Sequence, residues 1–312
     1  NVLKKHALFD VKDWIEECEQ YWKPLLIQEK KSTSRFKFNK YFLKNKKFNF
    51  NQDLYYDLYQ KIEISPKRDW WNLGWKARTN TVSELYQIDK SKCSEHRHED
   101  CHKIYGYFSS PFVGEDALVF TLEGGGDDSS ATVSIVNGNG NITELWSSNE
   151  VMIGRLYAYI TLILGMKPGQ HEYKVMGLAP YGNEKYSREI VKIFEKINIV
   201  DGIQIKNLKN FKDLYFSMID ELKYYRFDNI AFALQKYLED MVIKWVSNCI
   251  KKFNINKIIV SGGVGQNIKL AKALADSFGF KNIWHPPIAG DGSLGVGAAW
   301  IKSNQERKKP IP

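Results

Sequence analysis

The chain has 312 residues, 43% of them hydrophobic and 14% aromatic, so it can bury a large core as one large domain or two lobes. Its 45 basic and 36 acidic side chains give a net charge of +9, but the basic residues are scattered through a Lys-, Asn- and Ile-rich sequence, so we attribute the charge to composition and disfavour nucleic-acid binding. No apolar run approaches the ~18 residues of a membrane span, and the start lacks the apolar core of a signal peptide, so we expect a cytoplasmic protein without a membrane segment.

The cysteine pattern agrees with a cytoplasmic location. Cys18, Cys93, Cys101 and Cys249 have no CxxC spacing and form no dense framework. We therefore expect reduced thiols rather than a disulfide scaffold.

The first third of the chain is predicted to be helical and rich in aromatic residues. Residues 11–23 repeat apolar side chains at helical spacing, and Pro24 ends the pattern. Residues 30–67 interleave Lys with Phe and Tyr, a mixture that could bind nucleic acid by stacking and charge. We favour an aromatic-anchored helical region with solvated lysines, followed by a Trp cluster at residues 70–75 that anchors a loop or an interface.

A histidine pair follows at His98 and His102. Residues four apart lie on one helix face with Cβ atoms about 5–6 Å apart, close enough for both imidazoles to bind one metal ion. Such a pair is also common on a solvated helix face. A carboxylate far along the chain in a glycine-rich turn would favour the metal interpretation, because two histidines and one acid leave coordination positions open for substrate. Asp291 is a candidate for that carboxylate.

After Pro111 the pattern changes to strands. The apolar run 117–122 stops at a turn with three glycines and three acids, and residues 130–136 alternate like a second strand. We expect a hairpin with this turn at its mouth. Consecutive glycines let backbone N–H groups approach a phosphate closely, although an ordinary flexible turn would also explain them.

A second strand and glycine turn lie near the other end of the chain. Residues 257–260 form the predicted strand, residues 261–267 the turn, and a helix runs on through Leu274. This order offers helix N-terminal amides to an anion. The glycine spacing is not GxGxxG and no acid ends a following strand, so we expect no nicotinamide cofactor.

The last predicted units are a short strand at 282–285, a loop at 289–293 and a closing helix at 294–301. Small residues such as Gly295 and Gly297 give that helix a face on which other backbone can pack closely. Asp291 lies at the start of the helix, where a carboxylate ordinarily acts as a cap, so capping remains an alternative to metal binding.

Several stretches together resemble the O-carbamoyltransferase family that modifies nodulation factors, cephalosporins and aminoglycosides. The most specific is His171–Gly182 (HEYKVMGLAPYG), with Gly154–Tyr157 and Leu164-Gly165 upstream. Five more motifs occur in the family order, so that the resemblance covers residues 90–300. They are His98-x3-His102 with Ser110-Pro-Phe, Glu123–Asp127, Asn229–Gln235, Ser261–Val264 with Asn267, and Gly290–Gly292 with Gly297–Ala299.

The resemblance implies an α/β, two-lobed fold of the actin and heat-shock ATPase type, which is ribonuclease H-like and shared with the tRNA threonylcarbamoyl-transfer protein. We accordingly divide the chain into three parts. Residues 1–117 are an incomplete first lobe with the metal-binding helix, residues 118–300 are the second lobe with the nucleotide-binding turns and a last helix that returns to the first lobe, and residues 301–312 are a polar tail.

The resemblance also implies a reaction. A carbamoyl group passes from carbamoyl-adenylate, which a second domain or subunit makes from carbamoyl phosphate and ATP, to a hydroxyl of a small molecule. The metal, Fe²⁺ in preference to Zn²⁺ or Mn²⁺, would act as a Lewis acid held by His98, His102 and Asp291.

Other site residues follow from the same resemblance. Glu123 is expected to bind or orient the acceptor, and Lys174 to balance phosphate charge, although Lys174 could equally be structural. The nucleotide is expected on the glycine turns, at Gly124, Gly125, Gly126, Asp127, Gly262, Gly263, Val264, Asn267 and Gly290.

The sequence departs from the family pattern in three ways. The family's N-terminal strand and loop, with a histidine suited to activating the acceptor, have no counterpart before residue 11, and the adenylate-forming domain is missing after the polar tail. Glu99 replaces the second histidine of the usual pair, and Lys103 and Ile104 replace small residues. We therefore expect one part of a larger or split enzyme.

Two other classes of function remain. An RNA-modifying transferase like the tRNA relative would suit the positive charge and residues 30–67. A non-catalytic nucleotide-binding scaffold would follow if the metal ligands had decayed. The His171–Gly182 signature favours a small-molecule carbamoyltransferase over both.

Overall fold

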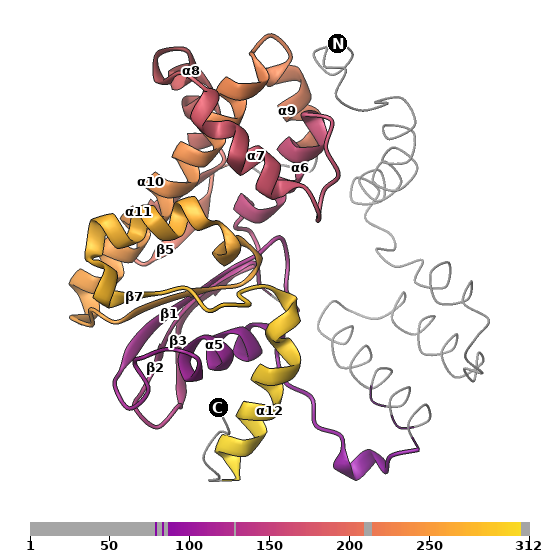
Figure 1. The fold of residues 1–312 in the computed structure, drawn as a ribbon, viewed down its shortest axis with the longest axis vertical. Coiled ribbons are helices and arrows are strands. Elements are labelled where there is room, and N and C mark those ends of the chain that lie inside the picture. Colours follow the sequence, from indigo (N-terminus) through magenta and orange to yellow (C-terminus); the bar gives the residue numbers. More distant parts are fainter. Residues whose placement is uncertain (1–78, 80–82, 84–86, 128, 209–213, 307–312) are drawn as a thin grey trace. The chain divides into compact units, whose positions relative to one another are not determined.

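The structure is a computed structural model that describes residues 79, 83, 87–127, 129–208 and 214–306 (Figure 1). The chain divides into two compact units, Tyr21–His96 and Asn1–Gln20 with Arg97–Pro312. The described part of the first unit holds the 3-10 helix η2 (Lys90–Lys92), where the Asp89 side chain accepts a hydrogen bond from Ser91 N. The predicted helix at 11–23, the aromatic segment 30–67 and the Trp cluster 70–75 lie outside the described residues, so the predicted lobe boundary at residue 117 stays a prediction.

A five-stranded mixed sheet forms the centre of the second unit. Its strand order is β3 (Ile142–Ser148), β2 (Ala131–Val136), β1 (Ala117–Leu122), β6 (Ile258–Ser261) and β7 (Ile283–Trp284). Strand β2 is antiparallel to β1 and β3, whereas β6 is parallel to β1 and β7 is parallel to β6. A sheet in this order with β2 alone reversed is ribonuclease H-like. The α/β fold class predicted from the sequence is confirmed.

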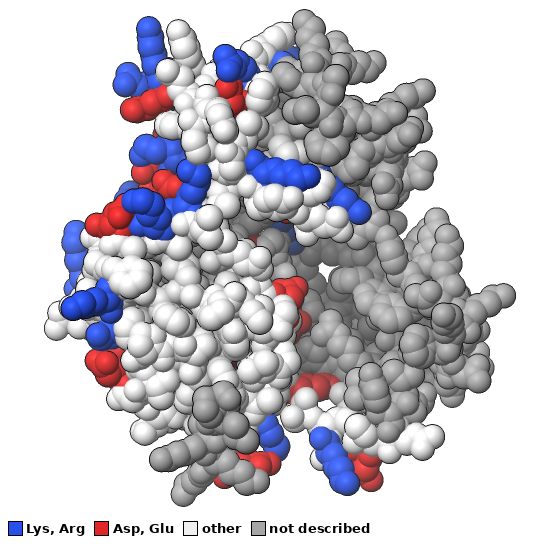
Figure 2. All heavy atoms as spheres, viewed as in Figure 1, with Lys and Arg blue, Asp and Glu red and all other residues white. Residues whose placement is uncertain are grey.

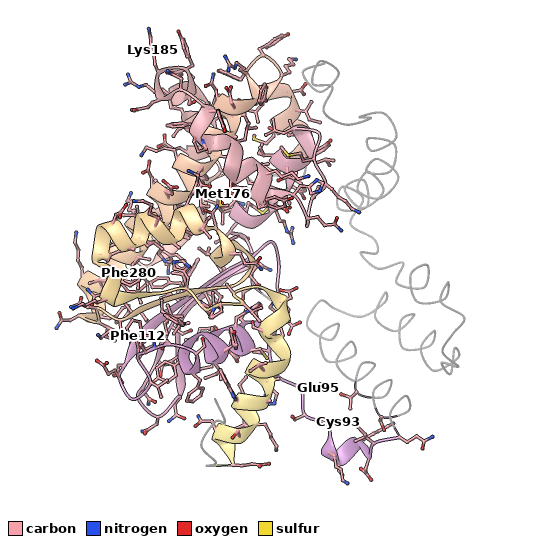
Figure 3. The ribbon with its side chains drawn as sticks, viewed as in Figure 1. Cys93, Glu95, Phe112, Met176, Lys185 and Phe280 are labelled. Carbon is pink, nitrogen blue, oxygen red and sulfur yellow. The ribbon has the colours of Figure 1, made fainter. Side chains whose placement is uncertain are left out.

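The strands follow from their hydrophobic patterns. All six residues of β1 are buried, because β1 is central and helices cover both sheet faces. On one face, Val119 and Ile259 pack with Ile104 of helix α5 (His98–Phe108) and with Phe112, which follows this helix (Figure 3). On the other face, Phe120 meets Trp245 of helix α10 (Phe227–Phe253) edge to face, with ring centroids 4.8 Å apart. The sheet is therefore the middle of three layers (Figure 1).

Helix α12 (Leu294–Gln305) packs directly on α5. A Cβ atom on Gly297 would collide with the carbonyl oxygen of Cys101, so only glycine permits this approach. The rings of Tyr105 and Trp300 stack beside this crossing with centroids 5.7 Å apart. Of the small residues predicted to pack closely, Gly297 makes the helix contact, whereas a Cβ on Gly295 would meet no atom within 4 Å. The contact at Gly297 brings the start of α12 next to α5.

The helices between β3 and β6 pack around α10. They are α6 (Ile153–Ile163), α7 (Glu172–Leu178), the 3-10 helix η3 (Ala179–Tyr181), α8 (Glu184–Glu195) and α9 (Leu214–Leu222), with a two-stranded ribbon of β4 (Asn198–Asp201) and β5 (Gln204–Asn207). After β6 come η4 (Gly263–Gln266), α11 (Ile268–Phe278) and η5 (Phe280–Asn282), and η6 (Asp291–Ser293) precedes α12.

Charged side chains of both signs alternate on the visible face (Figure 2). Many of them form ion pairs within one helix, such as Lys236 with Asp240 and Lys272 with Asp276. In each of these pairs the Lys Nζ lies 2.5 Å from a carboxylate oxygen. Among the described residues, no helix is long and apolar enough to cross a bilayer. The described cysteines, Cys93, Cys101 and Cys249, form no disulfide with one another.

Candidate metal centre

The histidine pair lies at the start of α5, with His98 as the first residue of the helix and His102 one turn later. The Asp127 carboxylate accepts a hydrogen bond of 2.9 Å from the backbone N–H of His98, and so caps the helix from the turn after β1. The His102 side chain is fully buried and that of His98 is 16% exposed. Their Nε2 atoms lie 3.2 Å apart, so both imidazoles point to one place, as the metal interpretation requires.

Glu123 approaches both histidines from the end of β1. One carboxylate oxygen lies 2.8 Å from His98 Nε2 and the other lies 2.8 Å from His102 Nε2. Its side chain is only 5% exposed. Glu123 therefore belongs to the same cluster as the histidines.

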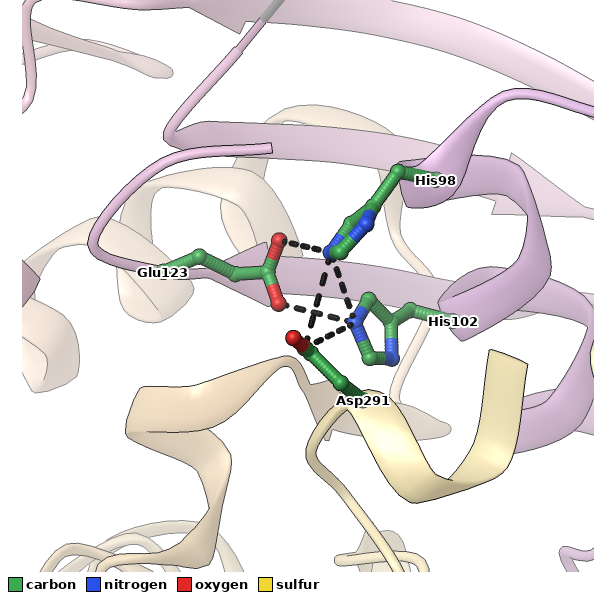
Figure 4. A group of neighbouring side chains, drawn as sticks. All are labelled: His98, His102, Glu123 and Asp291. Carbon is green, nitrogen blue, oxygen red and sulfur yellow. Dashed lines mark hydrogen bonds and ion pairs between the residues drawn. The ribbon is translucent and has the colours of Figure 1, made fainter. Parts of the chain in front are cut away.

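Asp291 completes the cluster from the other side of the fold. Its Oδ1 lies 3.7 Å from His98 Nε2 and 3.6 Å from His102 Nε2 (Figure 4). The capping alternative does not hold, because neither η6 nor α12 receives a side-chain cap. The side chain is 73% exposed, so the cluster opens to solvent on this side.

The residues of the cluster shift one another's pKa values. Burial by itself lowers the pKa of His102, but hydrogen bonds to Asp291 and Glu123 outweigh this and raise it to about 9. Burial raises the pKa of Glu123, but hydrogen bonds from His102 and His98 outweigh burial and lower it to about 2. The pKa of Asp291 is lowered chiefly by its hydrogen bond with His102. Without a metal, the site is a network of ion pairs.

The spacing of the four ligand atoms fits a metal ion. All lie within 4.8 Å of one another. Ligand atoms at about 2.1 Å from a metal are separated by about 3.0 Å at right angles and about 3.4 Å in a tetrahedron. The separations of the histidine nitrogens from each other and from the carboxylates run from 2.8 to 3.7 Å and so bracket these values.

The three glycine-containing turns meet at the same edge of the sheet. Because β1 and β6 are parallel, the turns that follow them lie side by side. Gly262 has a φ of +88°, and a Cβ there would lie 2.6 Å from the Leu122 carbonyl oxygen. Gly263 N donates to Glu123 Oε1 at 3.4 Å, and Gly262 N donates to the Ala289 carbonyl at 2.9 Å.

The predicted nucleotide-binding residues differ in their exposure and in their contacts. Gly124, Gly125 and Gly263 are exposed along this edge, and Gly126 and Val264 are half-buried there, whereas Gly262 and Gly290 are buried where the turns pack together. Asn267 and Asp127 hold the framework: the Asn267 amide oxygen caps α11 at Leu270 N, and its Nδ2 donates to Gln235 at 2.9 Å.

Lys174 takes no part in the ion pairs that join the histidine pair to Glu123 and Asp291. It belongs to helix α7, not to a turn between helices, and its ammonium lies 5.8 Å from the centroid of the Tyr173 ring.

The departures from the family pattern have structural roles. Glu99 is buried, accepts a hydrogen bond from Ser129 N at 3.3 Å, and lies where a Cβ on Gly126 would collide with its carboxylate. Lys103, fully buried, bonds Asp100 and Glu144 at 3.0 and 2.9 Å. Together they fasten α5 to the glycine turn and to β3.

The family resemblance put Glu123 near the metal as an acceptor-binding group, but the sequence did not predict its contacts with both histidines, nor the contact of Ser293 Oγ with His102 Nδ1 at 3.4 Å. The available signal for Glu123 was its position directly after a central apolar strand. Which side chain that position faces depends on how β1 and α5 pack, and the sequence pattern carries no information on that packing.

Comparison with known proteins identifies the family. The sequence profile described as carbamoyltransferase N-terminus matches residues 11–300. The chain belongs to this family. Nodulation protein NolO of Bradyrhizobium diazoefficiens is 30% identical over 220 residues, which are 69% of this chain and 39% of that protein. Nodulation protein NolNO of Sinorhizobium fredii is 29% identical over 70% of this chain and 32% of its own length.

Another relative has no function in its name. Uncharacterized protein MJ1051 of Methanocaldococcus jannaschii is 32% identical over 66% of this chain and 40% of its own length. The chain thus spans well under half of the curated relatives that it matches. Among solved structures, T. kodakarensis HypF has a TM-score of 0.42 and 12% identity, covering 73% of this chain and 39% of HypF. The fold assignment rests on the sheet topology instead.

Proposed function

We propose that this chain carries the transfer site of an O-carbamoyltransferase, which moves a carbamoyl group from carbamoyl-adenylate to a hydroxyl of a small molecule. The observation that carries the proposal is the convergence of His98, His102, Glu123 and Asp291, from three separate segments, on one point at the edge of the sheet. Membership of the carbamoyltransferase family supports carbamoyl as the group that is transferred.

The donor set suits a divalent metal. Imidazole and carboxylate ligands together fit Fe²⁺, Zn²⁺ or Mn²⁺, and we propose Fe²⁺ held by His98, His102 and Asp291. When bound, the metal would supply Lewis acidity toward the carbamoyl carbonyl or the acceptor oxygen. The exposed side of Asp291 supports an open position for substrate.

Glu123 has the properties of a positioning group for the acceptor. With its pKa lowered to about 2, it is ionised at neutral pH and accepts hydrogen bonds, but it is too weak a base to remove a hydroxyl proton efficiently. In the transfer, the acceptor oxygen bonds to the carbamoyl carbon, the bond from that carbon to the phosphate oxygen breaks, AMP leaves, and the hydroxyl proton passes to another base.

The glycine turns provide the place for the adenylate. Backbone N–H groups at Gly124, Gly125 and Gly263 lie at an exposed edge beside Glu123, where a phosphate can come close. We propose that Lys174 adds positive charge toward it. By the family resemblance, a separate domain or subunit makes the carbamoyl-adenylate from carbamoyl phosphate and ATP.

The compact ligand cluster supports a catalytic site over a decayed scaffold. The histidine contacts with Glu123 at 2.8 Å and the exposed Asp291 turned toward both rings leave a complete set of potential metal-binding groups around one point. A scaffold with a decayed metal site would lack one or more of these groups.

The test supplies pre-made carbamoyl-adenylate to the purified chain and measures carbamoyl transfer to a panel of hydroxyl compounds, together with metal content by elemental analysis. Asp291→Ala should lower metal affinity about 100-fold and abolish transfer. Asp240→Ala, which removes an exposed carboxylate on α10, is the matched control and should change neither.

Two outcomes would contradict the proposal separately. Unchanged metal content in Asp291→Ala would refute the metal site. Metal that is bound and lost as expected, without transfer to any acceptor, would refute carbamoyl transfer by this chain.

A further inference from the structure

A guanidinium lies against the glycine turn that follows Glu123. Arg155, on the first turn of α6, donates from Nε to the carbonyl oxygen of Gly124 at 2.8 Å. Its Nη2 lies 3.5 Å from the position that a Cβ on Gly125 would take. The side chain is half-buried, so it is held along this turn rather than extended into solvent.

The backbone fixes this arrangement. Gly154 packs so closely on the carbonyl of Glu123 that a Cβ there would collide with it. The start of α6 is therefore pressed onto the residue that enters the metal cluster. Arg155, the next residue, therefore starts beside the turn, within reach of the Gly124 carbonyl that it binds.

The charges around the turn favour a phosphate-binding role for Arg155. The carboxylates of Glu123 and Asp291 lie in the cluster at this edge of the sheet, and Glu123 directly precedes the turn, so a cation beside the turn favours the approach of an anionic donor. Arginine binds phosphate with two parallel N–H donors and stays charged at any physiological pH. Exposed Gly124 and Gly125 leave room for a phosphate next to the guanidinium.

We propose that Arg155 binds the phosphate of the adenylate donor at the Gly124–Gly126 turn. The inference rests on the proposed function and names a contact that the family motifs do not assign. The competing interpretation is that Arg155 only fixes the Gly124 carbonyl. The two differ in one respect: phosphate binding requires the positive charge, whereas fixing the carbonyl requires only the hydrogen bond.

The experiment measures the binding of AMP and of adenosine to the full chain by titration calorimetry, at several salt concentrations. Arg155→Gln should weaken AMP binding about 10- to 100-fold, flatten its salt dependence and leave adenosine binding and metal content unchanged. Arg155→Lys, which keeps the charge, should retain part of the AMP affinity. Arg188→Gln on the exposed face of α8 is the matched control and should bind AMP like the wild type.

The outcomes separate the two proposals. AMP binding by Arg155→Gln that equals the wild type, or a loss equal for AMP and adenosine, overturns the role of Arg155 and leaves the transfer site standing. A wild-type chain that binds no AMP overturns both. Thermal melts of each variant show whether a loss comes from misfolding.

Discussion

The charge state of each titratable side chain in the cluster depends on the side chains that it contacts. His102 is fully buried, and burial alone would keep its imidazole neutral; the contacts with Asp291 and Glu123 reverse this. Its pKa rises from 6.5 to about 9, so its stabilising effect is complete below pH 6.5 and is lost as the pH rises through 9. Glu123 falls from 4.5 to about 2, so its effect is present above pH 4.5 and is lost as the pH falls through 2.

We expect the metal-free protein to draw most stability from this cluster between pH 4.5 and 6.5. Glu123→Gln should be destabilised by about 3 kcal/mol in that window, and the difference from the wild type should shrink toward pH 9. Thermal melts of both proteins after chelation, over this pH range, measure it. A difference that stays constant with pH would show that the histidine is not charged.

Two helices set the distance across the site. Helix α5 carries both histidines, and Asp291 lies three residues before α12. Their contact at Gly297 and Cys101 leaves no space for a side chain. The separation of the metal ligands therefore depends on a helix contact outside the site.

Gly297→Ala should push α12 away from α5, destabilise the protein by about 1–3 kcal/mol and weaken metal binding through displacement of Asp291. Gly295→Ala is the matched control on the same helix, because a Cβ there meets no atom within 4 Å. It should bind metal normally and be stabilised by about 0.5–1 kcal/mol, since alanine favours a helix more than glycine. Chemical denaturation and metal titration measure both. Equal metal affinity in the two variants would argue against this contact as the determinant.

The charge distribution in the described part of the molecule does not favour nucleic acid as substrate. Most of the net charge of +9 lies in residues 1–78, outside the described residues, and the remaining sequence is nearly neutral. In the described part, basic and acidic side chains pair within helices, as Lys236 does with Asp240 (Figure 2). Such a surface offers phosphates no continuous positive track.

We expect the full chain to show little affinity for tRNA at about 0.15 M salt. Filter binding or fluorescence anisotropy across a salt series measures this, with heparin as a polyanion competitor that lacks bases. A tight, salt-steep affinity for tRNA that heparin does not abolish would favour the RNA-modifying alternative over a small-molecule acceptor.

Local features were predictable because they depend on neighbouring residues. The apolar run of β1 ends at Leu122 as predicted, and the second strand begins one residue later than predicted, at Ala131. The helical spacing of His98 and His102 placed both on one face, and the glycine turns marked the ends of β1 and β6. Each of these follows from backbone geometry or from periodic burial.

Tertiary structure decided which of these features meet. Whether Asp291 caps a helix or faces the histidines depends on the contact of Gly297 with Cys101, which lies across the fold. Glu123 reaches both rings because β1 and α5 pack face to face, and Arg155 lies at the turn because Gly154 admits a close approach. The sequence alone determined which chemical groups were available, whereas packing between segments far apart in the chain determined that they share one site.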